Sequence, residues 1–144
     1  MARHQNKKVI ILIAVRMKSR RLSQKALLKI EDKTVLEHLL DRLKLSKTSQ
    51  SIVVCTSVSP EDDILTKIAE KNGVKWFRGS EDDVMDRFIK AADKEKADII
   101  VRITGDNILI DPFYLDKAVK YHLKNKADYT SIDGLPSGVK SEIS

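Results

Sequence analysis

The sequence has few of the residues that form covalent links or special backbone conformations. Its 144 residues include one cysteine, three prolines and five glycines, and aromatic residues make up 5%. The single Cys55 excludes a disulfide framework and a cysteine-based metal cluster. The longest apolar run, Val9 to Val15, is too short to cross a bilayer and leads into Arg16 rather than a cleavage site. We therefore interpret this run as a core strand and expect a cytoplasmic protein with no membrane partner.

Glycine is missing where two common nucleotide-binding loops require it. No glycine occurs before Gly73. The loop after Val15 therefore lacks the flanking glycines and the Gly-Lys-Ser/Thr ending of a Walker A motif. For the same reason the amino-terminal region lacks the G-x-G-x-x-G pattern of dinucleotide-binding proteins. A site for a phosphorylated ligand at this loop must use other chemical groups.

Acidic residues are missing from the first thirty positions. This segment holds nine of the 27 basic residues and none of the 21 acidic ones, so the rest of a chain of net charge +6 is slightly acidic. Many of these basic residues follow the first apolar run, at Arg16, Lys18, Arg20, Arg21 and Lys25. In α/β proteins, phosphorylated ligands bind beyond the carboxyl end of the first strand. The pattern predicts a polyanionic small molecule as the ligand.

Apolar runs of strand length alternate with amphipathic helical stretches along the chain. This alternation predicts a Rossmann-like, three-layer α/β domain with a mainly parallel sheet, spanning residues 1–144 as one nucleotide-binding domain. The first, second and fourth strands are nearly continuously apolar, so both their faces should be covered. The predicted strands are Val9 to Val15, Ser51 to Thr56, Lys75 to Phe77 and Asp98 to Ile103.

Helix-start signals separate these strands. Thr34 and Glu37 form a T-x-x-E capping box, and Ser59, followed by proline and acids, is expected to cap a second helix. The acids at 81–83 are interpreted as the start of a third helix rather than a metal site, and Asp111-Pro112 opens a fourth that runs to about residue 125. Residues 129–132 could form a further strand, whereas 133–144 should be a loop. We expect the fold to be incomplete at its carboxyl end.

A second conspicuous segment follows the fourth predicted strand, at Thr104-Gly105-Asp106. In a doubly wound sheet this turn should meet the loop after the first strand. Arginine and lysine side chains hold phosphates, and a carboxylate opposite them recruits a hard cation such as Mg²⁺ that bridges phosphate oxygens. The two segments together favour a nucleoside triphosphate site.

Three sequence blocks resemble those of the cytidylyltransferases that include SpsF-like spore coat polysaccharide proteins and the CMP-sialic acid and CMP-KDO synthetases. Residues 15–25, VRMKSRRLSQK, resemble the family's A-R-M-G-S-T-R-L-P-G-K. Residues 77–84, FRGSEDDV, resemble F-R-G-S-E-D-D-V, and residues 101–112 resemble V-R-I-T-G-D-x-P-L-I-D-P. The blocks occur in order over almost the whole chain, which makes the resemblance specific.

The resemblance implies an enzyme that transfers a nucleotidyl group from CTP to a sugar and releases pyrophosphate, with Mg²⁺ as cofactor. The sugar would be a nonulosonic acid or another cell-envelope or polysaccharide precursor. It implies no nucleic-acid or membrane partner, and a homodimer if the family's further carboxyl-terminal region is present. The implied triphosphate-binding residues are Arg16, Ser19, Arg21 and Lys25; Ser80 and Thr104 would lie near the base and sugar, Asp106 would bind the metal, and Arg16, Lys25 and Asp106 would be catalytic.

The sequence departs from the family pattern at four glycine or proline positions. Lys18 replaces a loop glycine, Ser23 and Gln24 replace the proline and glycine before Lys25, and Ile108 replaces a proline. Proline and glycine fix unusual backbone angles, so these changes predict a looser loop or a different path. They leave open a shortened, non-catalytic nucleotide-binding or regulatory relative. A nucleic-acid binder that uses the basic amino-terminal arm is a third hypothesis, disfavoured by the low aromatic content.

Overall fold

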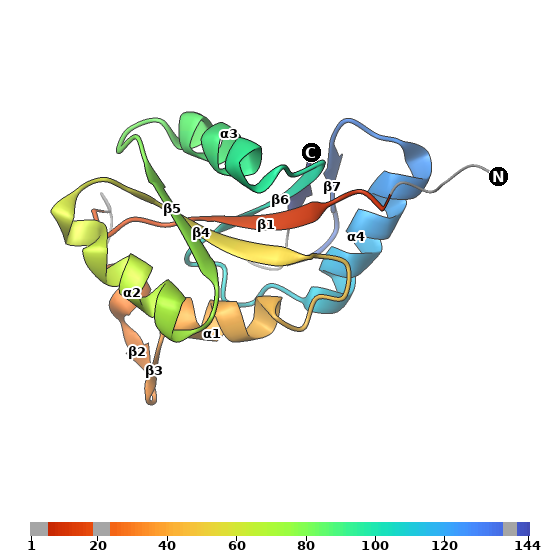
Figure 1. Ribbon diagram of the computed structural model, residues 1–144. Coiled ribbons are helices and arrows are strands. Elements are labelled where there is room, and N and C mark those ends of the chain that lie inside the picture. The colour runs from red at the N-terminus through yellow and green to blue at the C-terminus, as the bar shows by residue number, and fades with distance from the viewer. Residues whose placement is uncertain (1–5, 19–23, 137–140) are drawn as a thin grey trace.

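The computed structural model describes residues 6–18, 24–136 and 141–144. Six strands form one sheet in the order β5-β4-β1-β6-β8-β7, shown in Figure 1. The four strands β5, β4, β1 and β6 run parallel, and β8 pairs antiparallel with both β6 and β7. These strands are β1 (Val9–Ala14), β4 (Ser51–Ser57), β5 (Lys75–Gly79), β6 (Ile99–Thr104), β7 (Thr130–Ser131) and β8 (Glu142–Ile143).

Helices cover both faces of the sheet, which confirms the predicted three-layer α/β fold. Helices α1, α2 and α4 lie on one face and α3 lies on the other (Figure 1). They are α1 (Val35–Leu43), α2 (Asp63–Lys71), α3 (Val84–Glu95) and α4 (Pro112–Asn125), with 3-10 turns η1 (Lys25–Leu27) and η2 (Pro60–Asp62). In the part of the chain that the structure describes, none of the helices has the length and hydropathy needed to cross a bilayer.

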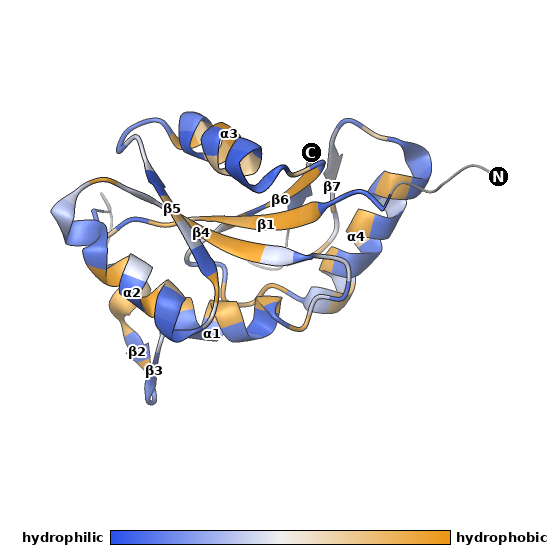
Figure 2. Ribbon diagram, in the orientation of Figure 1, coloured by the Kyte–Doolittle hydropathy of each residue, from blue (hydrophilic) through white to orange (hydrophobic). Residues whose placement is uncertain are grey.

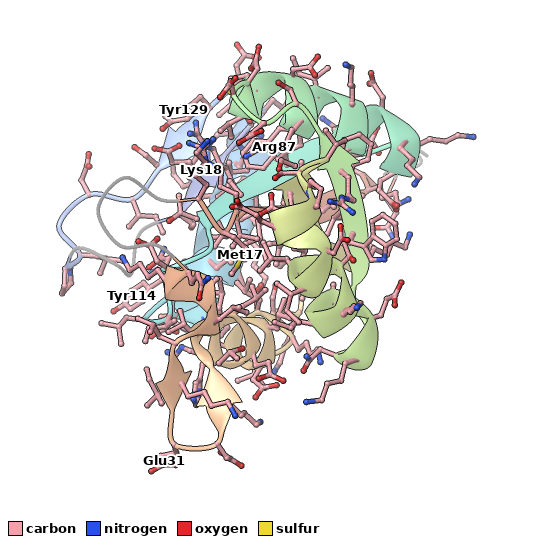
Figure 3. The ribbon with its side chains drawn as sticks, turned by 90° about the vertical axis from the view of Figure 1, so that its left-hand side faces the viewer. Met17, Lys18, Glu31, Arg87, Tyr114 and Tyr129 are labelled. Carbon is pink, nitrogen blue, oxygen red and sulfur yellow. The ribbon has the colours of Figure 1, made fainter. Side chains whose placement is uncertain are left out.

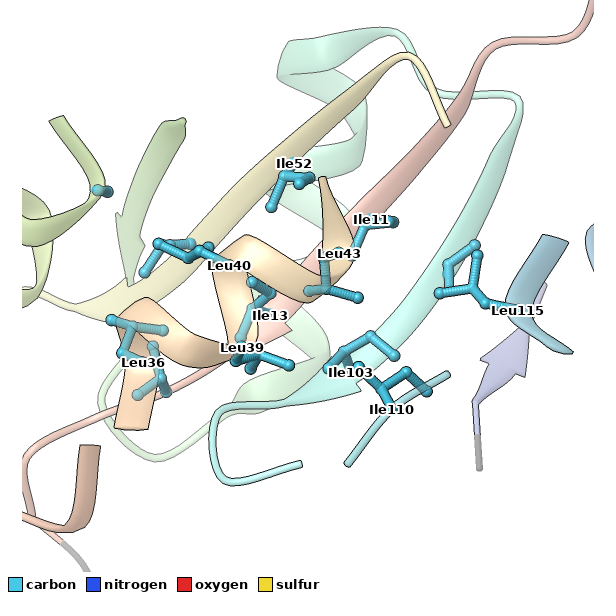
Figure 4. Close-up of a cluster of buried hydrophobic side chains, with 14 of the residues drawn as sticks. Ile11, Ile13, Leu36, Leu39, Leu40, Leu43, Ile52, Ile103, Ile110 and Leu115 are labelled. Atoms are coloured by element: carbon cyan, nitrogen blue, oxygen red, sulfur yellow. The ribbon is translucent and has the colours of Figure 1, made fainter. Parts of the chain in front are cut away.

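Strand β1 lies inside the sheet and is buried on both faces, as its continuous apolar run predicted. Ile11 and Ile13 pack against the leucines of α1 in the larger core cluster, shown in Figure 4. Ile10 and Leu12 pack with Phe88 of α3 in the smaller cluster on the opposite face. Figure 2 shows the resulting apolar band along the centre of the sheet. Burial of apolar area on this scale is the main stabilising term for the fold.

Strand β6 differs from the prediction that both its faces are covered. Val101 and Ile103 are buried, but Arg102 and Thr104 on the other face are exposed. Helix α3 packs mainly over β1, β4 and β5, and on this face of β6 the guanidinium of Arg102 lies 5.8 Å from the centre of the Phe88 ring. The prediction was wrong because it treated the run as continuously apolar, although residues 99–104 alternate as in a half-exposed strand.

The structure confirms that helices begin near the predicted start signals, but one predicted capping residue makes no capping bond. Thr34 Oγ1 accepts from Glu37 N at 3.2 Å and Thr34 N donates to Glu37 Oε2 at 2.9 Å, completing the capping box. Helix α3 begins at Val84, where Asp83 accepts from Asp86 N. The side chain of Ser59 makes no capping bond, and a 3-10 turn precedes α2 instead.

Two short pairings occur where no strand was predicted. Strands β2 (Lys29–Ile30) and β3 (Lys33–Thr34) form a small hairpin that projects from the body of the molecule (Figure 1). Strand β8 lies within residues 133–144, which were expected to be a loop. Its Ile143 is fully buried and lies opposite Val101 of β6. Strands of two residues are too short to show a recognisable periodicity, so only the tertiary pairing defines them.

Candidate functional site

A cleft of about 130 Å³ opens between the carboxyl ends of the adjacent parallel strands β1 and β6. It lies where two loops leave the sheet, the position at which α/β proteins bind their ligands. Figure 3 looks onto this end of the sheet. The residues that line the cleft are Ala14, Val15, Arg16, Lys25, Ala26, Thr104, Gly105 and Asp106.

Gly105 allows the two strand ends to approach closely. Its amide donates to the carbonyl of Ala14 at 2.9 Å, which extends the pairing of β1 and β6 by one bond. A Cβ atom at this position would lie 2.6 Å from the Cβ of Val15, closer than real Cβ atoms approach. Glycine is therefore required here, and it brings Asp106 beside the loop that follows β1.

Lys25 and Asp106 meet across the cleft. Lys25 Nζ lies 2.6 Å from Asp106 Oδ2, and both side chains are about half-exposed. The hydrogen bond from Lys25, with a smaller contribution from Thr104, holds the pKa of Asp106 below its usual value. The cleft therefore presents an ionised carboxylate and a lysine side chain that a ligand from solvent can reach.

Arg16 connects the same cleft to the loop that precedes α3. Its Nη1 donates to the carbonyl of Glu81 at 2.8 Å. Arg87 of α3 donates to the carbonyls of Ser80 at 2.7 Å and Glu81 at 3.1 Å from the other side. Burial and the nearby Arg16 lower the pKa of Arg87. The two guanidinium groups thus share one carbonyl and fix the 80–81 loop against the segment that follows β1, residues 15–25, which we call the basic loop.

A salt bridge also joins these two loops. Lys18 Nζ lies 3.7 Å from Glu81 Oε1, and both side chains reach solvent. Figure 3 shows Lys18, Met17 and Arg87 near the carboxyl end of the sheet. Exposed pairs of this kind contribute little to stability. The contact nevertheless places two further charged groups beside the cleft.

The comparisons with known proteins give one family. The family model described as "Cytidylyltransferase" matches residues 10–144, nearly the whole chain. The chain belongs to the cytidylyltransferase family. This membership confirms the family indicated by the three sequence blocks.

Relatives in the cytidylyltransferase family support the same placement. The chain is 37% identical to the spore coat polysaccharide biosynthesis protein SpsF of Bacillus subtilis, covering 94% of this chain and 58% of that protein. It is 34% identical to a 3-deoxy-manno-octulosonate cytidylyltransferase of Solibacter usitatus, over 78% of this chain and 44% of that protein. The chain spans about half the length of these curated relatives.

A solved cytidylyltransferase has the same fold. The structure from Leptospira borgpetersenii superimposes with a TM-score of 0.89 at 42% sequence identity, covering 95% of this chain and 60% of that one. This similarity supports the order and direction of the strands that form the cleft.

Four of the seven site residues expected from the family resemblance lie around the cleft: Arg16, Lys25, Thr104 and Asp106. Ser80 is not among the lining residues; its hydroxyl accepts from Asp83 N at 3.1 Å at the start of α3. Ser19 and Arg21 lie outside the described residues. Within the described ranges, no three potential metal-binding side chains come together, so Asp106 is considered as a ligand by itself.

Two buried charged residues beside the site were missed by the sequence analysis. Asp62 and Arg87 each have 1% of their surface exposed. Arg87 carried a readable signal, since it interrupts the apolar stripe of α3 between Val84 and Phe88, at the spacing of buried helix positions. Asp62 carried none, because an acid beside the first turn of a helix is expected for electrostatic reasons alone.

Proposed function

We propose that the chain binds CTP with Mg²⁺ in the cleft between β1 and β6 and transfers the cytidylyl group to a sugar. The sugar is a nonulosonic acid or another cell-envelope or polysaccharide precursor. The observation that carries the proposal is the 2.6 Å approach of Lys25 to Asp106 at the carboxyl ends of two adjacent parallel strands. Membership of the cytidylyltransferase family and the names of the two relatives support the choice of nucleotide and acceptor.

In this proposal the basic loop holds the triphosphate. Arg16 and Lys25 line the cleft, and Ser19 and Arg21 belong to the same loop. Lys25 exchanges its bond to Asp106 for the β- and γ-phosphates when CTP binds, since the triphosphate offers several negatively charged oxygens as acceptors of charge-assisted hydrogen bonds. Thr104 lines the cleft beside Asp106, and we assign Thr104 and Ser80 to the neighbourhood of the nucleotide base and sugar, as the family resemblance implies.

Asp106 suits a magnesium ion. Its carboxylate is half-exposed and ionised, and the side chain of Thr104 lies beside it. Mg²⁺ in nucleotide sites is held by one or two carboxylates, by substrate phosphates and by water, so one aspartate is a sufficient protein ligand. When bound, the ion neutralises charge on the phosphates and on the leaving pyrophosphate.

The reaction is an in-line displacement at the α-phosphorus. The oxygen of a sugar hydroxyl forms a bond to the α-phosphorus and its proton passes to water. The bond from the α-phosphorus to the oxygen that bridges to the β-phosphate breaks, and pyrophosphate leaves with that electron pair. Such chemistry depends on positioning and charge neutralisation rather than on a protein nucleophile. Arg16 and Lys25 supply these two effects from the protein side.

Isothermal titration with CTP and Mg²⁺ tests the binding half of the proposal. We expect Lys25→Ala to weaken CTP about tenfold or more, since a hydrogen bond between charged groups contributes about 1.5–3 kcal/mol. Lys33→Ala is a matched control, because Lys33 pairs with Asp41 at the same 2.6 Å and with similar exposure, in the β2–β3 hairpin region. The absence of binding heat with millimolar CTP, or equal affinities in the two variants, would contradict the proposal.

A non-catalytic nucleotide-binding relative is the second candidate function. It is favoured by the departures from the family pattern at Ser23 and Gln24. Pyrophosphate release, assayed with nonulosonic acids, 3-deoxy-manno-octulosonate and simpler sugars, separates the two. Turnover by this chain excludes the binding module, whereas CTP binding with no turnover on the whole panel favours it.

A further inference from the structure

A buried carboxylate joins the end of β4 to the loop that follows β1. Asp62 Oδ1 accepts from the amide of Met17 at 2.8 Å. Its Oδ2 accepts from Thr56 Oγ1 at 2.9 Å and from Ser57 N and Oγ at 3.0 and 2.5 Å. One oxygen thus faces the basic loop and the other faces the last residues of β4.

Met17 is the point at which the basic loop closes. Its carbonyl accepts from the amide of Gln24 at 3.0 Å, so the chain entering the loop is bonded to the chain leaving it. Its side chain is buried in the larger core cluster. Arg16 precedes Met17 and Lys25 follows Gln24. The position of Met17 therefore determines where the chain places both cations that line the cleft.

The four donors around Asp62 require a carboxylate. An ionised carboxylate accepts at both oxygens, whereas an asparagine would turn its amide hydrogens toward at least one donor. Burial alone would raise the pKa of Asp62, but the hydrogen bonds from Met17, Ser57 and Thr56 hold this pKa below its usual value. Helix α2 does not explain the arrangement, since the Asp62 side chain makes no capping bond to it.

We propose that Asp62 is the positioning residue of the nucleotide site: it fixes the stem of the basic loop so that Arg16 and Lys25 face the phosphates. The proposal rests on the proposed function, because it assigns the positioned loop to the triphosphate. Asp62 itself is buried and does not line the cleft. Its removal should therefore weaken binding of the β- and γ-phosphates more than binding of the nucleoside part.

The chain provides a matched control in Asp116. This carboxylate of α4 likewise accepts from a short Ser/Thr segment, with bonds from Ser46 Oγ at 2.6 Å, Lys47 N at 2.8 Å and Thr48 Oγ1 at 2.7 Å. The segment precedes β4 and so lies at the opposite end of the sheet from the cleft. Asp116→Asn removes a carboxylate with a similar set of donors without touching the basic loop, and because Asp116 is less buried than Asp62 the stability of each variant is measured beside its affinities.

The experiment measures the affinities for CTP and CMP, both with Mg²⁺, of the full chain and of the Asp62→Asn and Asp116→Asn variants. Thermal denaturation gives the stability of each. We expect Asp62→Asn to weaken CTP about tenfold, the effect of losing one hydrogen bond to a charged group, and CMP much less. Asp116→Asn should leave both affinities within about twofold of the parent, the scatter expected for a distant site.

The outcomes separate the two proposals. Equal loss of CTP and CMP affinity in Asp62→Asn, or a CTP affinity like that of Asp116→Asn, overturns the positioning role and leaves the proposed function intact. Failure of the parent chain to bind CTP overturns the proposed function and the positioning role with it. If Asp62→Asn does not fold, Asp62→Glu, which keeps the charge but is one methylene longer, takes its place with the same criteria.

Discussion

Gln24 occupies the left-handed region of backbone conformation, with φ 59° and ψ 22°. The related sequences that this loop resembles have glycine there, so the chain keeps the glycine-like path despite the side chain. A non-glycine residue in this region costs about 1–2 kcal/mol. Gln24→Gly should relieve this strain, but it also makes the unfolded chain more flexible. We expect a net gain of about 0.5 kcal/mol in the free energy of unfolding.

Urea denaturation of Gln24→Gly and Lys96→Gly measures this effect. Lys96 has φ 53° at the end of α3, so it shares the strain and lies away from the cleft. Both variants should gain stability, and neither should lose CTP affinity. A loss of stability in Gln24→Gly alone would mean that the glutamine side chain itself stabilises the loop.

At the residue scale, the sequence identified the groups that reach the cleft but not those that hold them in place. Lys25 and Asp106 could be predicted because each follows a recognisable strand, and strand ends meet in a parallel sheet. Asp62 could not, because its bond to Met17 joins residues 45 positions apart and has no local pattern. Bonds that support a site depend on tertiary placement, which periodicity does not reveal.

Helix α1 provides a test of stability at the scale of one element. Its capping box, with bonds to Thr34 first and to Lys71 as a smaller contribution, lowers the pKa of Glu37 from 4.5 to about 2. Because the folded-state pKa is depressed, the ionised Glu37 stabilises the fold above about pH 4.5. This stabilisation is lost as the pH falls from about 4.5 to about 2. We expect it to amount to roughly 3 kcal/mol at neutral pH.

Chemical denaturation of the parent and of Glu37→Gln between pH 7 and pH 2.5 measures this contribution. The parent should be more stable at neutral pH, and the difference between the two curves should shrink steadily as the pH falls from about 4.5 to 2.5. The difference between the curves is the relevant quantity, because Asp62, Asp106 and Asp116 also have lowered pKa values. Parallel curves over the whole range would show that Glu37 makes no net contribution through its charge.

At the element scale, long periodic segments were predicted well and short pairings were not. Strand β1 and helix α4 agree with their predicted bounds to within one residue, since apolar runs and the Asp111-Pro112 start are local signals. Strand β8 and the β2–β3 hairpin were missed, although Ile143 is fully buried against the sheet. A segment of two residues has no measurable periodicity, so whether it forms a strand depends on the strand beside which it packs.

At the scale of the whole molecule, the cleft exists only in the folded state. Lys25 and Asp106 are 81 positions apart, and Arg16 is held by a carbonyl 65 positions away. The amino-terminal segment brings the two cations that line the cleft, Arg16 and Lys25, and β6 with its glycine turn brings the carboxylate. The mainly parallel topology places the two at one edge, which is why the sequence alone could predict their convergence. A ligand of this cleft therefore stabilises the fold as a whole.

This linkage gives a prediction for thermal unfolding. At a CTP concentration of about 100 times the dissociation constant, selective binding to the folded state adds about 2.7 kcal/mol. For a chain of this length, that corresponds to a rise in Tm of roughly 10 °C.

Chelation of Mg²⁺ should remove part of the rise in the parent. In Asp106→Asn, the Mg²⁺-dependent part should disappear while a smaller, Mg²⁺-independent rise remains, because Arg16 and Lys25 still bind the phosphates. Scanning calorimetry with CTP, with and without Mg²⁺, measures both parts, and an unchanged Mg²⁺ dependence in Asp106→Asn would exclude Asp106 as the metal ligand.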